Sequence, residues 1–233
     1  MKKRELLTIL KNYPLFTFND FLKISNMNSK YAALYLFRLK KDGLIFQVEK
    51  GKYTLADDAL IPSSFILSPS YISFWTALRF HNLTEQLPKE IMIASPKSKK
   101  EITFLKTKIR FYKIRNLEGY KKERYKDTEI FVAEKEKAII DSLLAENTPF
   151  DEIIKALSQD VDSKKLAEYA LNTRNQSLIK RIGYLMDFFG LDSKVLLNSI
   201  NNNYILLDSM GKESGEKIRK WRIILNKNLH DIY

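Results

Sequence analysis

Apolar residues in the first part of the chain recur at helical spacing. Residues 5–10 predict a first helix, which ends before Pro14 because proline cannot continue a helix. A second helix is predicted to begin at Thr17. Its side chain can cap the helix, and Asp20 stands three positions later, as in a capping box. The polar residues 26–28 then indicate a turn.

A third helix is predicted to begin at Asn28 or Ser29 and to stop at Gly43. At 100° per residue, one face of this helix is apolar and carries Ala32, Tyr35, Leu36 and Leu39. The opposite face and its flanks carry Lys30, Ala33, Phe37, Arg38, Lys40 and Lys41. Two short helices, a turn and a third helix have the spacing of a helix-turn-helix, in which cations opposite an apolar stripe suit a major groove. A merely solvated amphipathic helix is the alternative interpretation of this segment.

A hairpin follows the third helix directly. Residues 44–48 predict one strand, 49–52 a tight glycine turn and 53–55 the return strand. A basic hairpin in this position is typical of a wing, which reaches DNA phosphates while the helix reads base edges. The residues expected to contact DNA are Asn28, Ser29, Lys30, Phe37, Arg38, Lys41, Lys50, Gly51 and Lys52.

The remainder predicts an α+β fold: a winged helix-turn-helix over 1–56, then a domain over 57–233 that is mixed α/β to about residue 148 and mainly helical afterwards. Helices are expected over 69–83, 134–144, 151–157, 163–171, 177–189 and 192–199. Strands are expected over 90–95, 102–105, 108–114, 129–133 and 204–207, with a final apolar run at 221–225.

Charge is distributed unevenly along the chain. Residues 1–56 hold 11 basic and 4 acidic side chains, and residues 97–126 hold 12 and 3, within a total net charge of +12. Such blocks suggest contact with a polyanion, although a solvated lysine-rich surface is the alternative for each. In the second block, basic and apolar residues alternate over 108–114, which predicts a strand with one positive face. This possible second basic face comprises Lys97, Lys99, Lys100, Lys106, Lys108, Arg110 and Lys113. It could support DNA contact or meet a partner.

The sequence offers little for catalysis or cofactors. It has no cysteine and two histidines, and no Gly-rich phosphate loop or metalloprotease motif, so we expect no metal, no cofactor and no enzymatic activity. A metal-dependent nuclease is the rival enzyme, but the chain lacks E-x-K, and its D-x-K sequences at Asp162 and Asp192 indicate helix N-caps. Glu134, Glu136 and Asp141 are expected to be structural carboxylates at the start of one helix. With no apolar run of about 18 residues and no signal-peptide core, a cytoplasmic location is expected.

Three segments carry a resemblance to a known family. Ser70–Leu78, Leu83–Pro88 and Val132–Asp141, together with the predicted winged helix, resemble the AbiEi antitoxins of type IV toxin–antitoxin (abortive-infection) systems, often described as regulators of viral defence. The resemblance implies that the winged helix binds inverted repeats in its own promoter as a repressor. It also implies that the second domain counteracts a nucleotidyltransferase-like toxin, without necessarily forming a stable complex. A winged-helix regulator that senses a ligand or another partner is the alternative.

Overall fold

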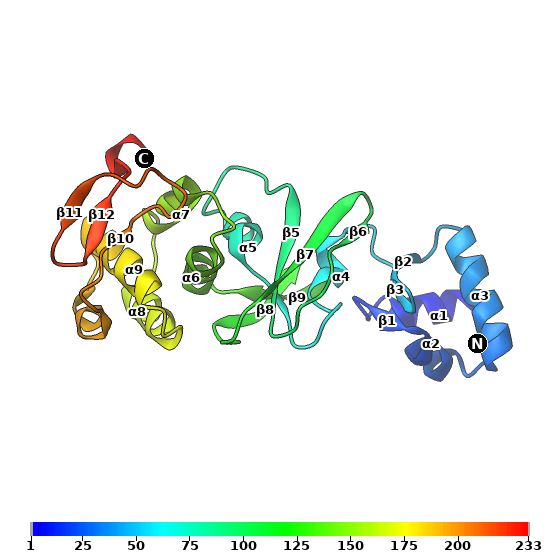
Figure 1. Cartoon of the computed structure of the whole chain (residues 1–233). Coiled ribbons are helices and arrows are strands. Elements are labelled where there is room, and N and C mark those ends of the chain that lie inside the picture. Colours follow the sequence, from blue (N-terminus) through cyan, green and yellow to red (C-terminus); the bar gives the residue numbers. More distant parts are fainter. Residues whose placement is uncertain (1, 233) are drawn as a thin grey trace. The chain divides into compact units, whose positions relative to one another are not determined.

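The computed structural model describes residues 2–232 and is a mixed α+β structure (Figure 1). Two compact units alternate along the chain. The first contains the chain up to Ile72 together with Lys89–Lys113 and Lys122–Val132, and the second contains Ser73–Pro88, Ile114–Lys121 and the chain from Ala133. The division predicted at residue 56 therefore falls inside the first unit.

The N-terminal segment of the first unit has three helices and a small sheet. In order, its elements are α1 (Lys3–Leu10), β1 (Phe16–Thr17), α2 (Phe18–Ser25), α3 (Ser29–Lys41), β2 (Phe46–Glu49) and β3 (Lys52–Thr54). The predicted capping box is confirmed, because the Thr17 hydroxyl accepts a hydrogen bond from the Asp20 amide while the Asp20 carboxylate accepts one from the Thr17 amide. The strand order is β1-β3-β2. β1 joins the hairpin as a third strand that the sequence patterns did not indicate.

A six-stranded sheet follows, after the short helix α4 (Leu60–Ser63). Its strands are β4 (Tyr71–Ile72), β5 (Glu90–Ser95), β6 (Ile102–Phe104), β7 (Thr107–Lys113), β8 (Tyr120–Tyr125) and β9 (Thr128–Ala133). They lie in the order β6-β7-β5-β4-β9-β8. The central residues of β5, Ile91–Ala94, form a continuous apolar run and are buried, as expected for a strand inside a sheet. β5 pairs in parallel with β7 over six positions.

The predicted helix over 69–83 is wrong in its first half. Tyr71 and Ile72 form β4, which pairs with β5 on one side and with β9 on the other, and α5 (Phe74–Phe80) begins only afterwards. Phe74 adopts a positive φ of 55°, which separates the strand from the helix. Pairing with two neighbouring strands outweighs the helical spacing of this segment, as tertiary context often does.

The second unit is mainly helical, as expected. Its helices are α5, α6 (Lys135–Ala145), α7 (Phe150–Leu157), α8 (Ser163–Asn172) and α9 (Gln176–Phe188), followed by the 3-10 helices η1 (Lys194–Ser199) and η2 (Leu229–Asp231). The predicted strand at 204–207 and the apolar run at 221–225 contain β10 (Ile205–Leu206) and β12 (Ile223–Leu225). They form a three-stranded sheet with β11 (Glu216–Ile218), a strand that was not predicted.

A buried polar cluster connects α6 with the residue that precedes α5. The Asp141 carboxylate accepts hydrogen bonds of 2.7 Å from both the Ser73 hydroxyl and the Lys137 ammonium group. The Lys137 and Asp141 side chains are only 1% and 0% exposed, so their charges are compensated almost without water. The three residues come from two of the segments that carry the family resemblance.

We expect Asp141→Ala to destabilise the protein by about 3–5 kcal/mol, because it leaves the Lys137 ammonium group buried without its counter-charge. Urea denaturation followed by circular dichroism measures this. The double variant Lys137→Met/Asp141→Leu is the control, since it removes both charges and should regain much of the lost stability. Equal losses in the two variants would show that packing, and not the buried charge, is what matters there.

Candidate nucleic-acid interface

The orientation of α3 is set by its apolar stripe. Ala32, Leu36 and Leu39 are buried in the core of the N-terminal segment, while Tyr35 is partly buried against it. Leu6, Leu10, Phe16, Phe21 and Ile45 complete that core. Asn28 is the N-cap and accepts a hydrogen bond from the Tyr31 amide, as predicted. Its side-chain oxygen is therefore occupied in holding the helix.

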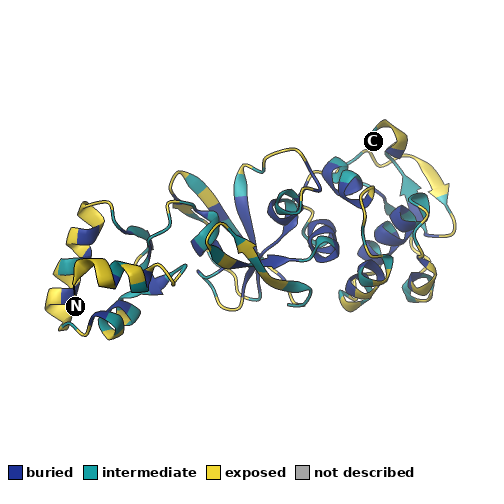
Figure 2. Cartoon of the chain, turned by 180° about the vertical axis from the view of Figure 1, so that it is seen from behind, coloured by how far each residue is buried: buried dark blue, intermediate teal, exposed yellow. Residues whose placement is uncertain are grey.

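The opposite face of α3 is exposed, as Figure 2 shows. Lys30, Arg38 and Lys41 are exposed, and no hydrogen bond or ion pair of their side chains occurs within residues 2–232. Phe37 is 63% exposed and lies among these cations. Ser29 is exposed at the first turn. The helix also exposes Tyr31 and Leu34, which were not among the predicted contacts. Tyr31, Leu34 and Phe37 are exposed, so they do not serve the core of the segment. Together with the cations they give this face a mixture of charged and apolar groups, which can contact base edges and thymine methyl groups.

The hairpin β2–β3 turns at Lys50 and Gly51. Gly51 has a φ of 79°, a conformation that favours glycine, and its carbonyl accepts a hydrogen bond from the Phe18 amide. Lys50 is exposed, and its side chain makes no hydrogen bond or ion pair with another described residue. Lys52, by contrast, pairs with Glu49 at 3.0 Å and donates to the Ile66 carbonyl at 2.5 Å. Only one of the two predicted tip lysines is therefore available in this structure.

Glu49 joins the two basic blocks. Its carboxylate pairs with Lys52 of the hairpin and, at 2.6 Å, with Lys99 of the loop that connects β5 to β6. Burial raises the pKa of Glu49, but the hydrogen bonds and charges of Lys99 and Lys52 outweigh it and hold the pKa below its ordinary value. These pairs therefore stabilise the folded state fully above about pH 4.3, the ordinary glutamate pKa, and less as the pH falls below it.

The second basic face divides into two parts. Lys97 and Lys100 are exposed in the same loop as Lys99, without side-chain partners among the described residues. On β7, however, Lys108 lies 3.8 Å from Glu101, and Arg110 pairs with Glu101 at 3.0 Å and with Glu90 at 3.2 Å. Carboxylates thus already compensate the two cations on the face of this strand.

One prediction about β7 is wrong. Lys113 was placed on the same face as Lys108 and Arg110, but side chains alternate along a strand, so it has the parity of the buried Ile109 and Phe111. Lys113 is nevertheless exposed, and it is the last residue of the strand. Lys106 is also exposed, in the turn between β6 and β7, where its φ is 64°.

The carboxylates that a nuclease would need are engaged separately. Glu134 accepts from Lys165 and Tyr169, and Glu136 from the Asp162 amide, while Asp141 belongs to the buried cluster. Asp162 caps α8, as predicted. Asp192 accepts from the Lys194 amide, but Ser193 holds the N-cap position of η1, so that prediction was one residue off.

In residues 2–232, no three His, Cys, Asp or Glu side chains are grouped so that they could hold a metal ion. No helix in that range combines the length and apolar character needed to traverse a bilayer. No protein-family model matches the chain, and no curated protein matches it.

We expect Glu49→Gln to loosen the hairpin, because a neutral amide replaces the carboxylate that pairs with Lys52 and Lys99. Loss of about 1 kcal/mol of local stability corresponds to roughly five-fold faster amide hydrogen exchange in β3. Asp57→Asn, which neutralises an exposed acid whose side chain makes no hydrogen bond or ion pair with another described residue, is the matched control. Unchanged exchange in Glu49→Gln would mean that the ion pairs do not anchor the hairpin.

Proposed function

We propose that this chain is a DNA-binding transcriptional regulator whose N-terminal segment is a winged helix-turn-helix. The observation that carries the proposal is the outward face of α3, where three cations without partners in the described chain lie opposite a buried apolar stripe. The hairpin β2–β3 follows that helix directly and presents Lys50 at its turn. A recognition helix followed by a basic wing has this composition and order.

In this proposal α3 enters the major groove with Lys30, Arg38 and Lys41 toward DNA, and Phe37 approaches base edges or thymine methyl groups. Lys50 contacts the phosphate backbone from the wing. Lys97 and Lys100 extend that phosphate contact, because the pair between Glu49 and Lys99 holds their loop beside the hairpin. Double-stranded DNA with inverted repeats in its own promoter is the expected ligand, and repression the expected result.

Charge removal should reveal which cations contact phosphates. We expect Lys50→Ala and Lys97→Ala each to weaken binding to all duplexes alike and to flatten the salt dependence by about one unit of slope. Lys108→Ala is the matched control, because its ammonium group lies near Glu101 instead of being free. Fluorescence anisotropy at several salt concentrations measures both quantities. Unchanged slopes for Lys50→Ala and Lys97→Ala would remove these residues from the DNA interface.

We further propose that the chain is the antitoxin of a type IV toxin–antitoxin system and counteracts a nucleotidyltransferase-like toxin. The resemblance to the AbiEi antitoxins in the segments 70–78, 83–88 and 132–141 supports this assignment. In the structure, Ser73, Lys137 and Asp141 from those segments interact in the buried cluster. Their burial suits a role in holding the second unit together, so we place the antitoxin surface on other, exposed residues.

DNA binding and toxin neutralisation should be separable in the full-length protein. We expect the triple variant Lys30→Ala/Arg38→Ala/Lys41→Ala to lose promoter affinity by at least ten-fold while still restoring growth when the adjacent toxin is expressed from an independent promoter. Growth curves under co-expression measure protection, and anisotropy measures DNA binding. A triple variant that folds normally but fails to protect would place neutralisation on the α3 surface.

A further inference from the structure

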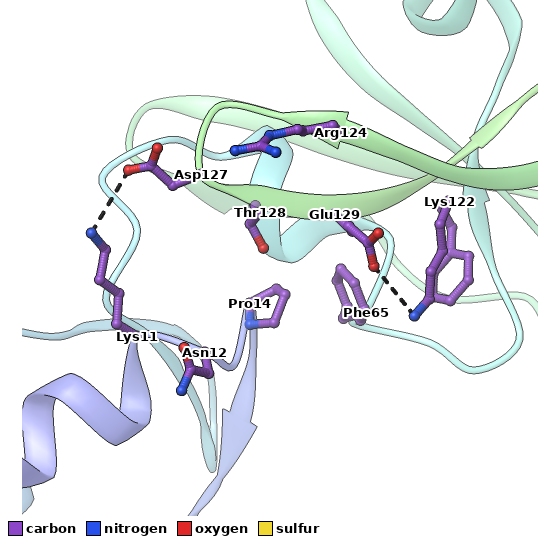
Figure 3. Close-up of a pocket in the computed structure, with 10 residues that line it drawn as sticks. Lys11, Asn12, Pro14, Phe65, Lys122, Arg124, Asp127, Thr128 and Glu129 are labelled. Carbon is purple, nitrogen blue, oxygen red and sulfur yellow. Dashed lines mark ion pairs between the residues drawn. The ribbon is translucent and has the colours of Figure 1, made fainter.

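An open groove of about 660 Å³ lies in the first unit, and none of the residues that line it belongs to α3. The residues between α1 and β1 form one side, and the β8–β9 hairpin forms the other (Figure 3). Its two ends are marked by ion pairs between Lys11 and Asp127, at 3.7 Å, and between Lys122 and Glu129, at 3.5 Å. Its volume lies in the range of small-molecule sites.

The charge in this groove is not balanced. The two ion pairs account for both acids of the lining, and they leave the guanidinium group of Arg124 as the excess charge. Arg124 is exposed, and its side chain makes no hydrogen bond or ion pair within the part of the chain that the structure describes. A planar guanidinium group binds a carboxylate through two parallel hydrogen bonds, and one excess positive charge matches one negative charge.

Other lining groups favour a flat ligand. Phe65 and Phe131 are partly exposed, with ring centroids 5.5 Å apart, and Pro14 lies beside Phe65 in Figure 3. Such surfaces accept an aromatic ring face or edge. The Thr128 hydroxyl and the Asn12 amide also line the groove, and neither side chain has a partner among residues 2–232. They can donate hydrogen bonds to a bound anion.

We propose that this groove is a binding site for a small aromatic carboxylate. The carboxylate pairs with Arg124 and accepts hydrogen bonds from Thr128 or Asn12, and the ring packs on Phe65 and Pro14. The ligand would contact both the segment between α1 and β1 and the β8–β9 hairpin. It would change DNA affinity to the extent that DNA binding rearranges these two segments, and DNA would change ligand affinity by the same factor. That coupling rests on the proposed function, whereas the binding itself does not.

Isothermal titration of the full-length protein, without DNA, tests the site with benzoate as the probe. A ligand of this size should bind with a dissociation constant on the order of 1 mM. Benzamide, which lacks the charge, and acetate, which lacks the ring, should each bind at least ten-fold more weakly. Equal binding of benzoate and benzamide would overturn the proposal, as would no benzoate binding at 20-fold higher concentration, about 20 mM.

Variants locate the binding. Arg124→Gln should weaken benzoate at least ten-fold and leave benzamide unchanged, and Phe65→Leu should weaken both. Arg219→Gln, which changes an exposed arginine of the second unit, is the matched control. Unaltered benzoate binding by a folded Arg124→Gln protein contradicts the site. In the wild type, benzoate should shift the NMR signals of Phe65 and Thr128, which tests the location without any variant; shifts confined to other residues would also contradict it.

Discussion

The burial of one stripe of α3 is the constraint on which the N-terminal segment depends. Ala32, Leu36 and Leu39 can leave water only by packing on the core of that segment, and the helical period then directs the opposite residues outward. Lys30 and Arg38 are exposed for this reason. The same packing that stabilises the segment therefore presents its cations, so folding and the proposed DNA contact have one physical origin.

Electrostatics within the first unit then selects among the many basic residues. Glu49 engages Lys52 and Lys99, and acids on and beside the sheet compensate Arg110. Lys52, Lys99 and Arg110 would have to exchange a carboxylate for a phosphate in order to contact DNA, which gains little in net free energy. Cations without such partners, Lys50 among them, can release counterions on binding at no such cost. Net charge alone does not distinguish the paired from the unpaired basic residues as candidates for DNA contact.

Local chemistry made part of this structure predictable. A short stretch of sequence is enough to recognise the capping box of Thr17, the apolar stripe of α3 and the apolar run of β5. β4 was not predictable in this way, because two distant strands create it, and β8 was missed because its polar sequence lacks an apolar alternation. The ion pair between Glu49 and Lys99 joins residues 50 positions apart, and no sequence pattern reports such a contact.

Hydrogen–deuterium exchange of the full-length protein, with and without a duplex from its own upstream region, tests whether α3 and the β2–β3 hairpin contact DNA. With the duplex bound, we predict slower exchange in α3, in the turn of the β2–β3 hairpin and in the loop that holds Lys97 and Lys100, with little change in α6 to α9. This protection should disappear at high salt, because phosphate contacts weaken as salt rises. Protection confined to the second unit, or none at DNA concentrations well above micromolar, would contradict the assignment of α3 and the hairpin as the DNA-binding surface.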